Sequence, residues 1–176
     1  AGSPDLRSRL DAAMTATRSA LASIEAGGGP DDPPPASLES LEARLAEATR
    51  PLLEASLAAG ASDAARSALA SGLIGWGLAI VAGRLGIAAR DHGRSLVPAS
   101  LTDSIPGFAD RHVASARAGH GVDAAFLRRS LLPVRTMGDR AWERLAASAA
   151  ALEAADPAAA VPVLMLLEHA RARLIR

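Results

Sequence analysis

The sequence of 176 residues contains no cysteine, lysine, tyrosine, asparagine or glutamine, and it has only two tryptophans and two phenylalanines. Without cysteine there can be no disulfide, no thiolate nucleophile and no thiolate metal site. Without lysine there can be no Schiff-base lysine and no Walker-type phosphate loop. These absences exclude several large enzyme classes. Because aromatic and β-branched residues suit pleated strands, their scarcity also disfavours a β-sheet.

Alanine and leucine dominate the residues that are present: 43 are Ala and 24 are Leu, against 7 Val and 6 Ile. Both lose little free energy on entering a helix. A chain of this length buries roughly 70% of its unfolded surface, which is enough for one domain with a core. We therefore expect a single all-α domain over residues 1–176, a bundle of six to eight helices around a central apolar helix at about residues 63–91.

Charge is balanced, because 19 arginines face 19 acidic residues and the net charge is zero. No general attraction to nucleic-acid backbones is therefore expected. Five arginines lie close together in the sequence: Arg128, Arg129, Arg135, Arg140 and Arg144. A solvated helix face is the simpler interpretation of this cluster, and a local basic patch is the alternative.

Helix ends are marked clearly in the first third of the chain. Residues 3–5 supply an N-cap serine, a first-turn proline and an acid, and they predict a helix that ends at Gly27. Glycine and proline then fill 27–36, which predicts an exposed, flexible connector or, alternatively, a proline-rich ligand for an aromatic groove. Ser37 is the expected N-cap of a second helix, which Pro51 should kink or split.

Further helices follow the central one. We expect one at about 107–118, one that Asp123 caps and Pro133 breaks or kinks, one over about 136–155, and a last one from Pro157 to the C-terminus. One face of the helix at 136–155 is expected to carry four residues: Trp142, Leu145, Ala149 and Leu152.

The central helix is apolar nearly all round, with Arg84 as the only charge between Arg66 and Arg90. Such a segment is either a buried core helix or a membrane span. The internal arginine, the glycines and the lack of a second comparable span favour the core helix, so no transmembrane segment is expected. Since the sequence carries no secretory signal pattern, we expect a cytoplasmic location.

Small residues recur every three or four positions along this helix and form a stripe: Ala68, Gly72, Gly75, Ala79, Gly83 and Gly86. A helical glycine costs about 1 kcal/mol relative to alanine, so four on one face require a compensating gain. Close approach of another helix supplies it, and the last helix of the chain is the expected neighbour. A ligand lying along the groove and a second copy of the chain are the alternatives. Leucine at position 75 or 83 should therefore damage the protein more than leucine at position 147.

Two further residues of the central helix are candidates for function. Trp76 sits beside the stripe, where we expect it to fill the core with its indole N–H satisfied or to line a ligand pocket. Arg84 should pair with a carboxylate, bind helix-terminal carbonyls or reach the surface. The candidate residues for binding a partner or ligand are therefore Gly72, Gly75, Trp76, Ala79, Gly83 and Arg84.

No catalytic or metal-binding motif is recognisable. The four histidines, at positions His92, His112, His120 and His169, form no HExxH pattern, and no serine lies in a GxSxG motif. No metal-ligand set is predicted, and the sequence identifies no particular cofactor. One exception is a helical GTPase activator, which needs little more than a positioned arginine, and Arg18 or Arg50 could supply it.

Our leading hypothesis is a non-enzymatic interaction or regulatory module that binds a protein partner, or a second copy, through a helix face or groove. The alternative is a bundle that holds a small apolar ligand or cofactor in a cavity near Trp76, lined by Leu73 and Ile80. The second alternative is an arginine-dependent activator or enzyme whose polar groups meet only in the folded protein.

Overall fold

The computed structural model describes residues 4–27, 33–57, 61–118 and 124–155. Over these ranges the chain is all-α, as expected, and forms no strand; its five α-helices are fewer than the six to eight expected. They are α1 (Pro4–Ala26), α2 (Leu38–Ser56), α3 (Asp63–Ile87), α4 (Phe108–Ala118) and α5 (Ala124–Ala155), with a π-helical turn η1 (Ala88–His92) and a 3-10 turn η2 (Ala99–Leu101). The helix expected from Pro157 and the cap expected at Asp123 lie outside the described residues.

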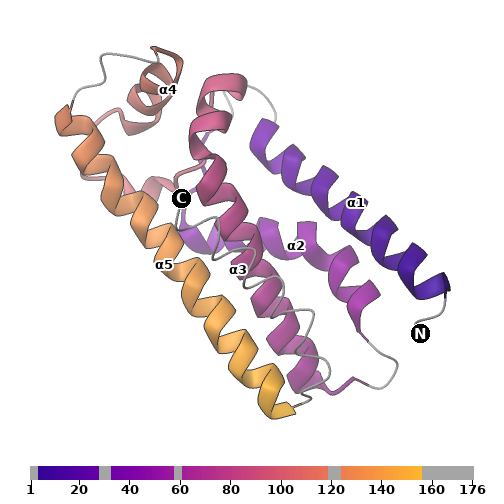
Figure 1. Ribbon diagram of the computed structural model, residues 1–176. Helices are drawn as coiled ribbons and strands as arrows, with labels where there is room; N and C mark the ends of the chain where they lie inside the picture. The colour runs from indigo at the N-terminus through magenta and orange to yellow at the C-terminus, as the bar shows by residue number, and fades with distance from the viewer. Residues whose placement is uncertain (1–3, 28–32, 58–60, 119–123, 156–176) are drawn as a thin grey trace.

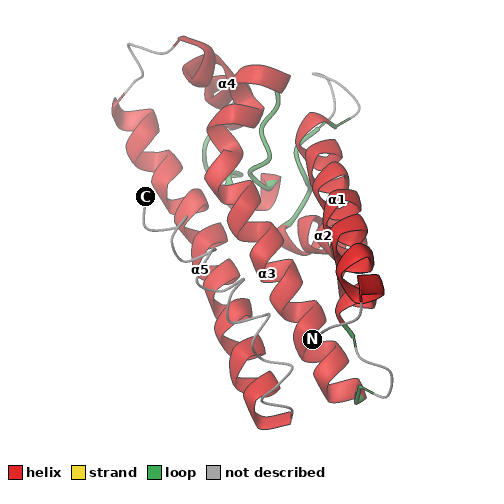
Figure 2. Cartoon of the chain, turned by 45° about the vertical axis from the view of Figure 1, so that its right-hand side comes forward, coloured by secondary structure: helices red, strands yellow, loops and turns green. Residues whose placement is uncertain are grey.

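Helix α3 lies at the centre of the bundle (Figure 1). It packs along α5 in the most extensive helix contact of the fold, and against α2 on another side. Helix α1 packs mainly on α2, and α4 lies against η1 at the end of α3. Figure 2 shows α3 and α5 side by side, with α1 and α2 together on the other flank. The core contains fully buried leucines from α2, α3, α5 and the loop between η1 and η2: Leu41, Leu45, Leu73, Leu78, Leu96, Leu145 and Leu152.

Local signals place the helix ends where the sequence predicts them. Gly27 ends α1 with a φ of 61°, and Gly93 ends η1 with a φ of 68°, a left-handed conformation that glycine adopts without strain. Ser37 and Ser40 form a reciprocal capping box at the start of α2, and Ser62 caps α3. These ends depend on residues close in sequence, which is why the pattern identifies them.

At Pro133 the sequence predicts a break or a kink, and the break is wrong. Helix α5 runs through this residue as one helix of 32 residues, and α2 likewise continues past Pro51. A proline inside a helix costs about 3 kcal/mol, because it lacks an N–H and clashes with the preceding turn. Burial of the α5 face that includes Met137 and Leu145 against α3 offsets that cost. Two expected helices are therefore one.

Of the connector expected at 27–36, Gly27 and the last four residues are described. Pro35 is buried, and its carbonyl oxygen accepts a hydrogen bond of 2.8 Å from the backbone of η2. The guanidinium of Arg94, itself buried, donates to the carbonyl oxygens of Ile24 at 3.3 Å and Pro33 at 3.4 Å. The connector is therefore held to the body of the protein at Pro33 and Pro35, while Gly27, Pro33 and Ala36 are exposed as expected.

One helical stretch in the described part of the chain, Asp63–His92, is long and apolar enough to cross a membrane by length and composition alone. Within the fold, 61% of its most apolar window is buried against the other helices. The central core helix of a bundle has these same properties, because its neighbours cover it on several sides.

Candidate functional site

The small-residue stripe of α3 is covered by α5. A Cβ added at Gly75 would lie 2.9 Å from the carbonyl oxygen of Ala141 and 3.0 Å from Cβ of Arg144. Gly72 and Ala79 are buried on either side of this point. The predicted close approach is thus correct for the middle of the stripe, where the neighbour is α5; the last helix expected from Pro157 lies outside the described residues.

The expectation is wrong for the end of the stripe. Gly83 and Gly86 are exposed, and a Cβ added to either would meet no atom within 4 Å. Figure 1 shows the reason: α3 and α5 spread apart toward the N-terminal end of α5. Spacing alone identifies a face on which helices can approach, but not how far along that face they stay together.

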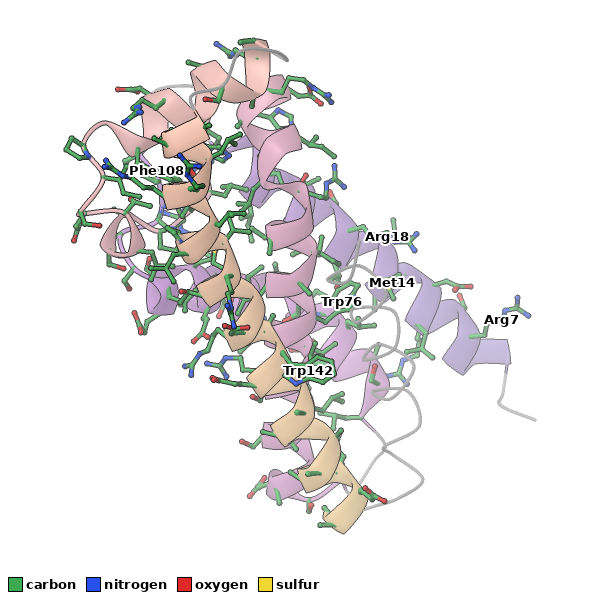
Figure 3. The ribbon with its side chains drawn as sticks, turned by 60° about the vertical axis from the view of Figure 1, so that its left-hand side comes forward. Arg7, Met14, Arg18, Trp76, Phe108 and Trp142 are labelled. Carbon is green, nitrogen blue, oxygen red and sulfur yellow. The ribbon has the colours of Figure 1, made fainter. Side chains whose placement is uncertain are left out.

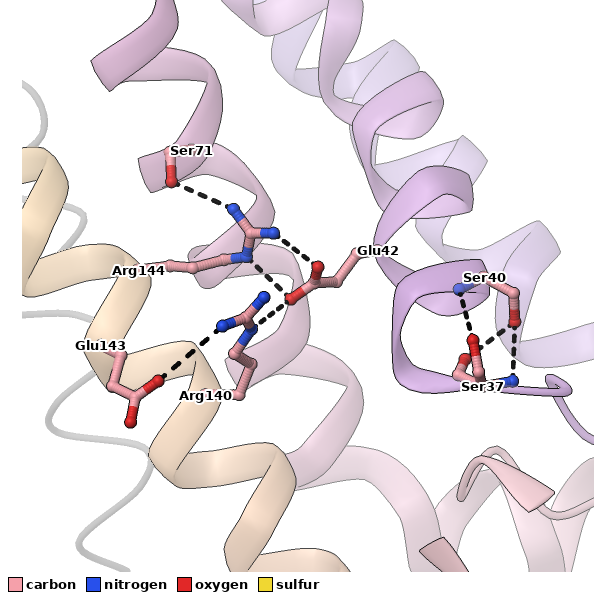
Figure 4. Close-up of polar contacts among 7 residues, drawn as sticks. All are labelled: Ser37, Ser40, Glu42, Ser71, Arg140, Glu143 and Arg144. Carbon is pink, nitrogen blue, oxygen red and sulfur yellow. Dashed lines mark hydrogen bonds and ion pairs between the residues drawn. The ribbon is translucent and has the colours of Figure 1, made fainter. Parts of the chain in front are cut away.

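The arginines of α5 form two groups, those that bind a buried carboxylate on α2 and those that do not. Glu42 accepts hydrogen bonds of 2.8 Å from Nε of Arg140 and from Nε of Arg144, and a second Arg144 nitrogen binds its other oxygen (Figure 4). Arg144 also donates to Ser71 of α3 at 3.1 Å. These contacts join three helices, and sequence reasoning did not single out Glu42.

The charge state of Glu42 follows from two opposed effects. Burial raises the pKa of its carboxyl, but the hydrogen bonds from Arg144 and Arg140 outweigh burial, and the pKa lies below its ordinary value. The ionised form is therefore the one that the fold stabilises. Arg140 and Arg144 are structural residues and do not contribute to a free basic patch.

The N-terminal half of α5 is different, because three of its leucines are exposed while Phe126 and Met137 are buried. Leu127, Leu131 and Leu132 are 50%, 66% and 70% exposed, and Arg128 and Arg129 are exposed beside them. At about 100° per residue, these side chains follow one another around one side of the helix in the order Leu127, Leu131, Arg128, Leu132, Arg129. We call these five residues the leucine–arginine face.

A cavity of about 350 Å³ adjoins this face. It lies between α5 and the η2 loop, and its lining comprises Leu101, Ser104, Ile105, Arg128, Arg129, Leu132 and Pro133. In the part of the chain that is described, neither Arg128 nor Arg129 has an ion-pair partner; Arg135 pairs with Asp139 at 3.5 Å. The cavity thus combines apolar walls with two arginines that form no ion pair within the described ranges.

A second cavity, of about 320 Å³, lies between α1 and α3 beside Trp76, and we call it the α1–α3 cavity. Figure 3 labels Trp76 of α3 and Arg18 of α1, both of which line it. Ile80 belongs to its lining as expected, whereas Leu73 is fully buried elsewhere in the core. Trp142, expected on the inner face of α5, is 45% exposed.

Arg84 has the carboxylate partner that the sequence predicts. Its Nη2 lies 3.0 Å from a carboxylate oxygen of Glu25, whose side chain is 3% exposed. Burial raises the pKa of Glu25, and the nearby charges of Arg84 and His92 lower it by less. Trp76 is buried as expected, but its indole N–H has no acceptor among the described residues.

For the enzyme hypothesis, the relevant contact is between Ser95 Oγ and Nδ1 of His112, at 3.1 Å. Ser95 is buried, and its oxygen also accepts the backbone N–H of Val97, so the pair anchors a loop. Burial lowers the pKa of His112. Arg50, a candidate activating arginine, pairs with Glu47 on the exposed surface of α2.

Within the described ranges, no group of three or more His, Asp or Glu side chains could hold a metal ion. His120 and His169 lie outside those ranges. Two candidate sites are present among the described residues: the leucine–arginine face with its adjoining cavity, and the α1–α3 cavity. No family model, curated protein or solved structure matches this chain.

Proposed function

We propose that this chain is a non-enzymatic helical interaction module that binds a protein partner through the leucine–arginine face of α5. The observation that carries the proposal is the outward position of Leu127, Leu131 and Leu132. Burying a leucine stabilises a protein by about 1.5–3 kcal/mol relative to leaving it exposed. Single exposed leucines are common, but three within two turns of one helix, beside a cavity, are typical of an interface.

The adjoining cavity supports a specific docking mode. Interfaces draw most of their binding free energy from a few side chains that enter pockets, surrounded by contacts that exclude water. At about 350 Å³, the cavity beside Leu132 has room for one aromatic or aliphatic side chain of a partner. The leucines of α5 would then cover the rest of an apolar helix face.

The charge of this face indicates which kind of helix it would bind. Arg128 and Arg129 border the leucines and line the cavity without an ion-pair partner in the described part of the chain. Their complement is an acidic amphipathic helix, with leucine-like anchors flanked by aspartate or glutamate. A second copy of the same face would place arginines opposite arginines, which disfavours self-association here. The short length of the face and its discrete cavity favour a protein over an anionic lipid surface.

The test measures binding of labelled synthetic helices to the full chain by fluorescence anisotropy. One peptide carries leucine anchors flanked by glutamates, and a second has the same sequence with lysines in place of glutamates. We expect the acidic peptide to bind and the basic one to bind at least tenfold more weakly. Leu131→Asp and Arg128→Glu should each weaken the acidic peptide's binding about tenfold or more, because each removes part of the complementary surface.

Matched controls come from exposed positions elsewhere, Ala147→Asp on α5 and Arg44→Glu on α2. Both should bind the acidic peptide like the parent. Equal binding of the two peptides, or equal losses in the controls, contradicts the proposal. Binding to phosphatidylglycerol vesicles that depends on Leu131 and Arg128, with no peptide binding, would assign the face to a membrane surface instead.

A further inference from the structure

Two residues that line the α1–α3 cavity, Trp76 and Arg84, each carry a buried hydrogen-bond donor without an acceptor among the described residues. Trp76 is 4% exposed, and its Nε1–H finds no acceptor in the described part of the chain. The same holds for the Nε–H of Arg84, although another nitrogen of that guanidinium binds Glu25. Buried donors are nearly always paired, because an unpaired one loses its hydrogen bonds to water without replacement. Both donors therefore call for an acceptor from outside the described residues.

The rest of the cavity is apolar and small. Leu21 and Ala22 of α1 and Ile80 of α3 line it, together with the ring of Trp76. Its volume of about 320 Å³ lies at the lower end of the range for small-molecule sites, roughly 300–1,000 Å³. Apolar walls with a few convergent polar groups are the usual composition of such a site. The occupant should therefore have a compact apolar body and one polar head.

The charges of the lining decide the sign of that head. Two arginines, Arg18 and Arg84, and one carboxylate, Glu25, line the cavity, so an ionised Glu25 leaves one positive charge in excess. A carboxylate accepts hydrogen bonds from both guanidinium and indole donors, and charge-assisted bonds of this kind are the stronger ones. We infer that the α1–α3 cavity binds a small carboxylate with a compact apolar body, whose head group accepts hydrogen bonds from Trp76, Arg84 and Arg18.

The inference is independent of the proposed partner-binding function, because it concerns other helices and other residues. Its test uses the full chain with Trp142→Phe, which leaves Trp76 as the single tryptophan. Three probes share one body and differ in the head: 4-phenylbutyrate, 4-phenylbutanol and 4-phenylbutylammonium. Binding is followed by Trp76 emission and by calorimetry. The carboxylate should bind about tenfold more tightly than the alcohol, and the ammonium should bind most weakly.

Two pairs of variants on α1 test separately how the cavity recognises the polar head group and the apolar body of the ligand. Ala22→Phe should occupy the cavity and weaken all probes at least tenfold, while Ala12→Phe, at an exposed position of α1 outside the lining, should have no effect. Arg18→Gln should weaken the carboxylate about tenfold and leave the alcohol unchanged. Arg9→Gln, another exposed arginine of α1 outside the lining, is its control. Calorimetry on Trp76→Phe, which keeps a ring but lacks the N–H, should show a several-fold loss for the carboxylate.

Three results would overturn the inference. The first is the absence of binding by any of the three probes. The second is equal affinity for the carboxylate and the ammonium, since the lining then recognises no charge. The third is binding that appears only after residues 156–176 are deleted, because that segment of the chain would then be the occupant of the cavity.

Discussion

Gly75 of α3 lies directly against Ala141 of α5, so closely that a Cβ on Gly75 would be 2.9 Å from the carbonyl oxygen of Ala141. Real Cβ atoms almost never come so near another atom, and the obstacle is backbone, which cannot rotate away. The longest helix contact of the bundle therefore depends on the absence of one methyl group. Gly83, two turns later on the same stripe, has open space at the equivalent point.

The two glycines should respond oppositely to the same substitution. Gly75→Ala forces α3 and α5 apart, and overpacking of this kind costs about 1–3 kcal/mol, more than the gain of about 1 kcal/mol in helix propensity. Gly83→Ala keeps that gain without a clash and should stabilise by up to about 1 kcal/mol. Thermal unfolding should report a fall in Tm for the first and a rise of roughly 2–4 °C for the second.

Ala147→Leu serves as the reference for larger side chains, because position 147 is exposed on α5. Gly75→Leu should melt well below Ala147→Leu. Gly83→Leu, which the sequence pattern alone predicts to be damaging, should melt close to it. A large loss at position 83 would mean that this end of the stripe is covered in the folded protein.

The contrast between these glycines marks what a sequence can and cannot predict here. Ser37 and Ser62 bind backbone groups within three residues of themselves, so the pattern places the starts of α2 and α3 correctly. A close neighbour at Gly83 and a helix break at Pro133 were predicted wrongly, because the packing of a distant helix determines the surroundings of both residues. Periodicity identifies an approachable face, and burial elsewhere determines whether a proline is tolerated.

The candidate sites were harder to predict for the same reason. Glu42 follows a leucine on an amphipathic helix and reads as a solvated acid, but its partners Arg140 and Arg144 lie 98 and 102 positions away in the sequence. Leu131 and Leu132 look like core residues by hydropathy, but they lie away from the face of α5 that Pro133 and Met137 bury, and they are exposed. Trp76 and Arg84 were singled out because each is unusual within its own apolar helix, and both line the α1–α3 cavity.

Glu42→Gln should destabilise the protein at neutral pH by about 1–2 kcal/mol, since it removes the charge that two arginines bind and both arginines remain partly solvated. The sign of the pH dependence follows from the lowered pKa of Glu42. Its contribution is present above the ordinary value of 4.5 and is lost as the pH falls through the lower, folded-state value. Urea unfolding at pH 7 and at pH 3 should therefore show a difference from the parent that disappears in acid.

Glu143→Gln is the matched control for this measurement. Glu143 is 68% exposed and lies 3.9 Å from Arg140, so its loss should change stability by less than about 0.5 kcal/mol at either pH. If Glu42→Gln and Glu143→Gln lose the same amount of unfolding free energy, the contacts of Glu42 with α5 stabilise the protein no more than an exposed ion pair does.

Glu25 should show the opposite dependence on pH. Burial raises its pKa, so the folded state keeps the proton just above pH 4.5, where the unfolded chain has lost it. Stability should therefore fall as the pH rises from 4.5 through the folded-state value. Glu25→Gln has no ionisable group at this position and should not lose stability in this way. The neighbouring charges Arg84, Arg18 and His92 are present in both the parent and the variant, so their effects cancel in the comparison. The difference in unfolding free energy, parent minus variant, should decrease between pH 4.5 and pH 7; an increase would mean that Arg84 dominates over burial.

The prolines inside helices provide the last prediction. At position 51 the chain has no N–H to donate to the carbonyl four residues earlier, and an interior proline is about 3 kcal/mol less favourable than alanine. Pro51→Ala should therefore stabilise the protein by about 1–3 kcal/mol and raise Tm by roughly 3–10 °C. Pro133→Ala should gain less, because Pro133 is buried and its ring fills space beside the leucine–arginine face.

Hydrogen exchange on Pro51→Ala adds a direct check, since the new amide at position 51 should be protected as part of α2. An unprotected amide at position 51, with no gain in Tm, would contradict the prediction. It would mean that the series of helical hydrogen bonds in α2 is interrupted at this residue whether or not it is a proline.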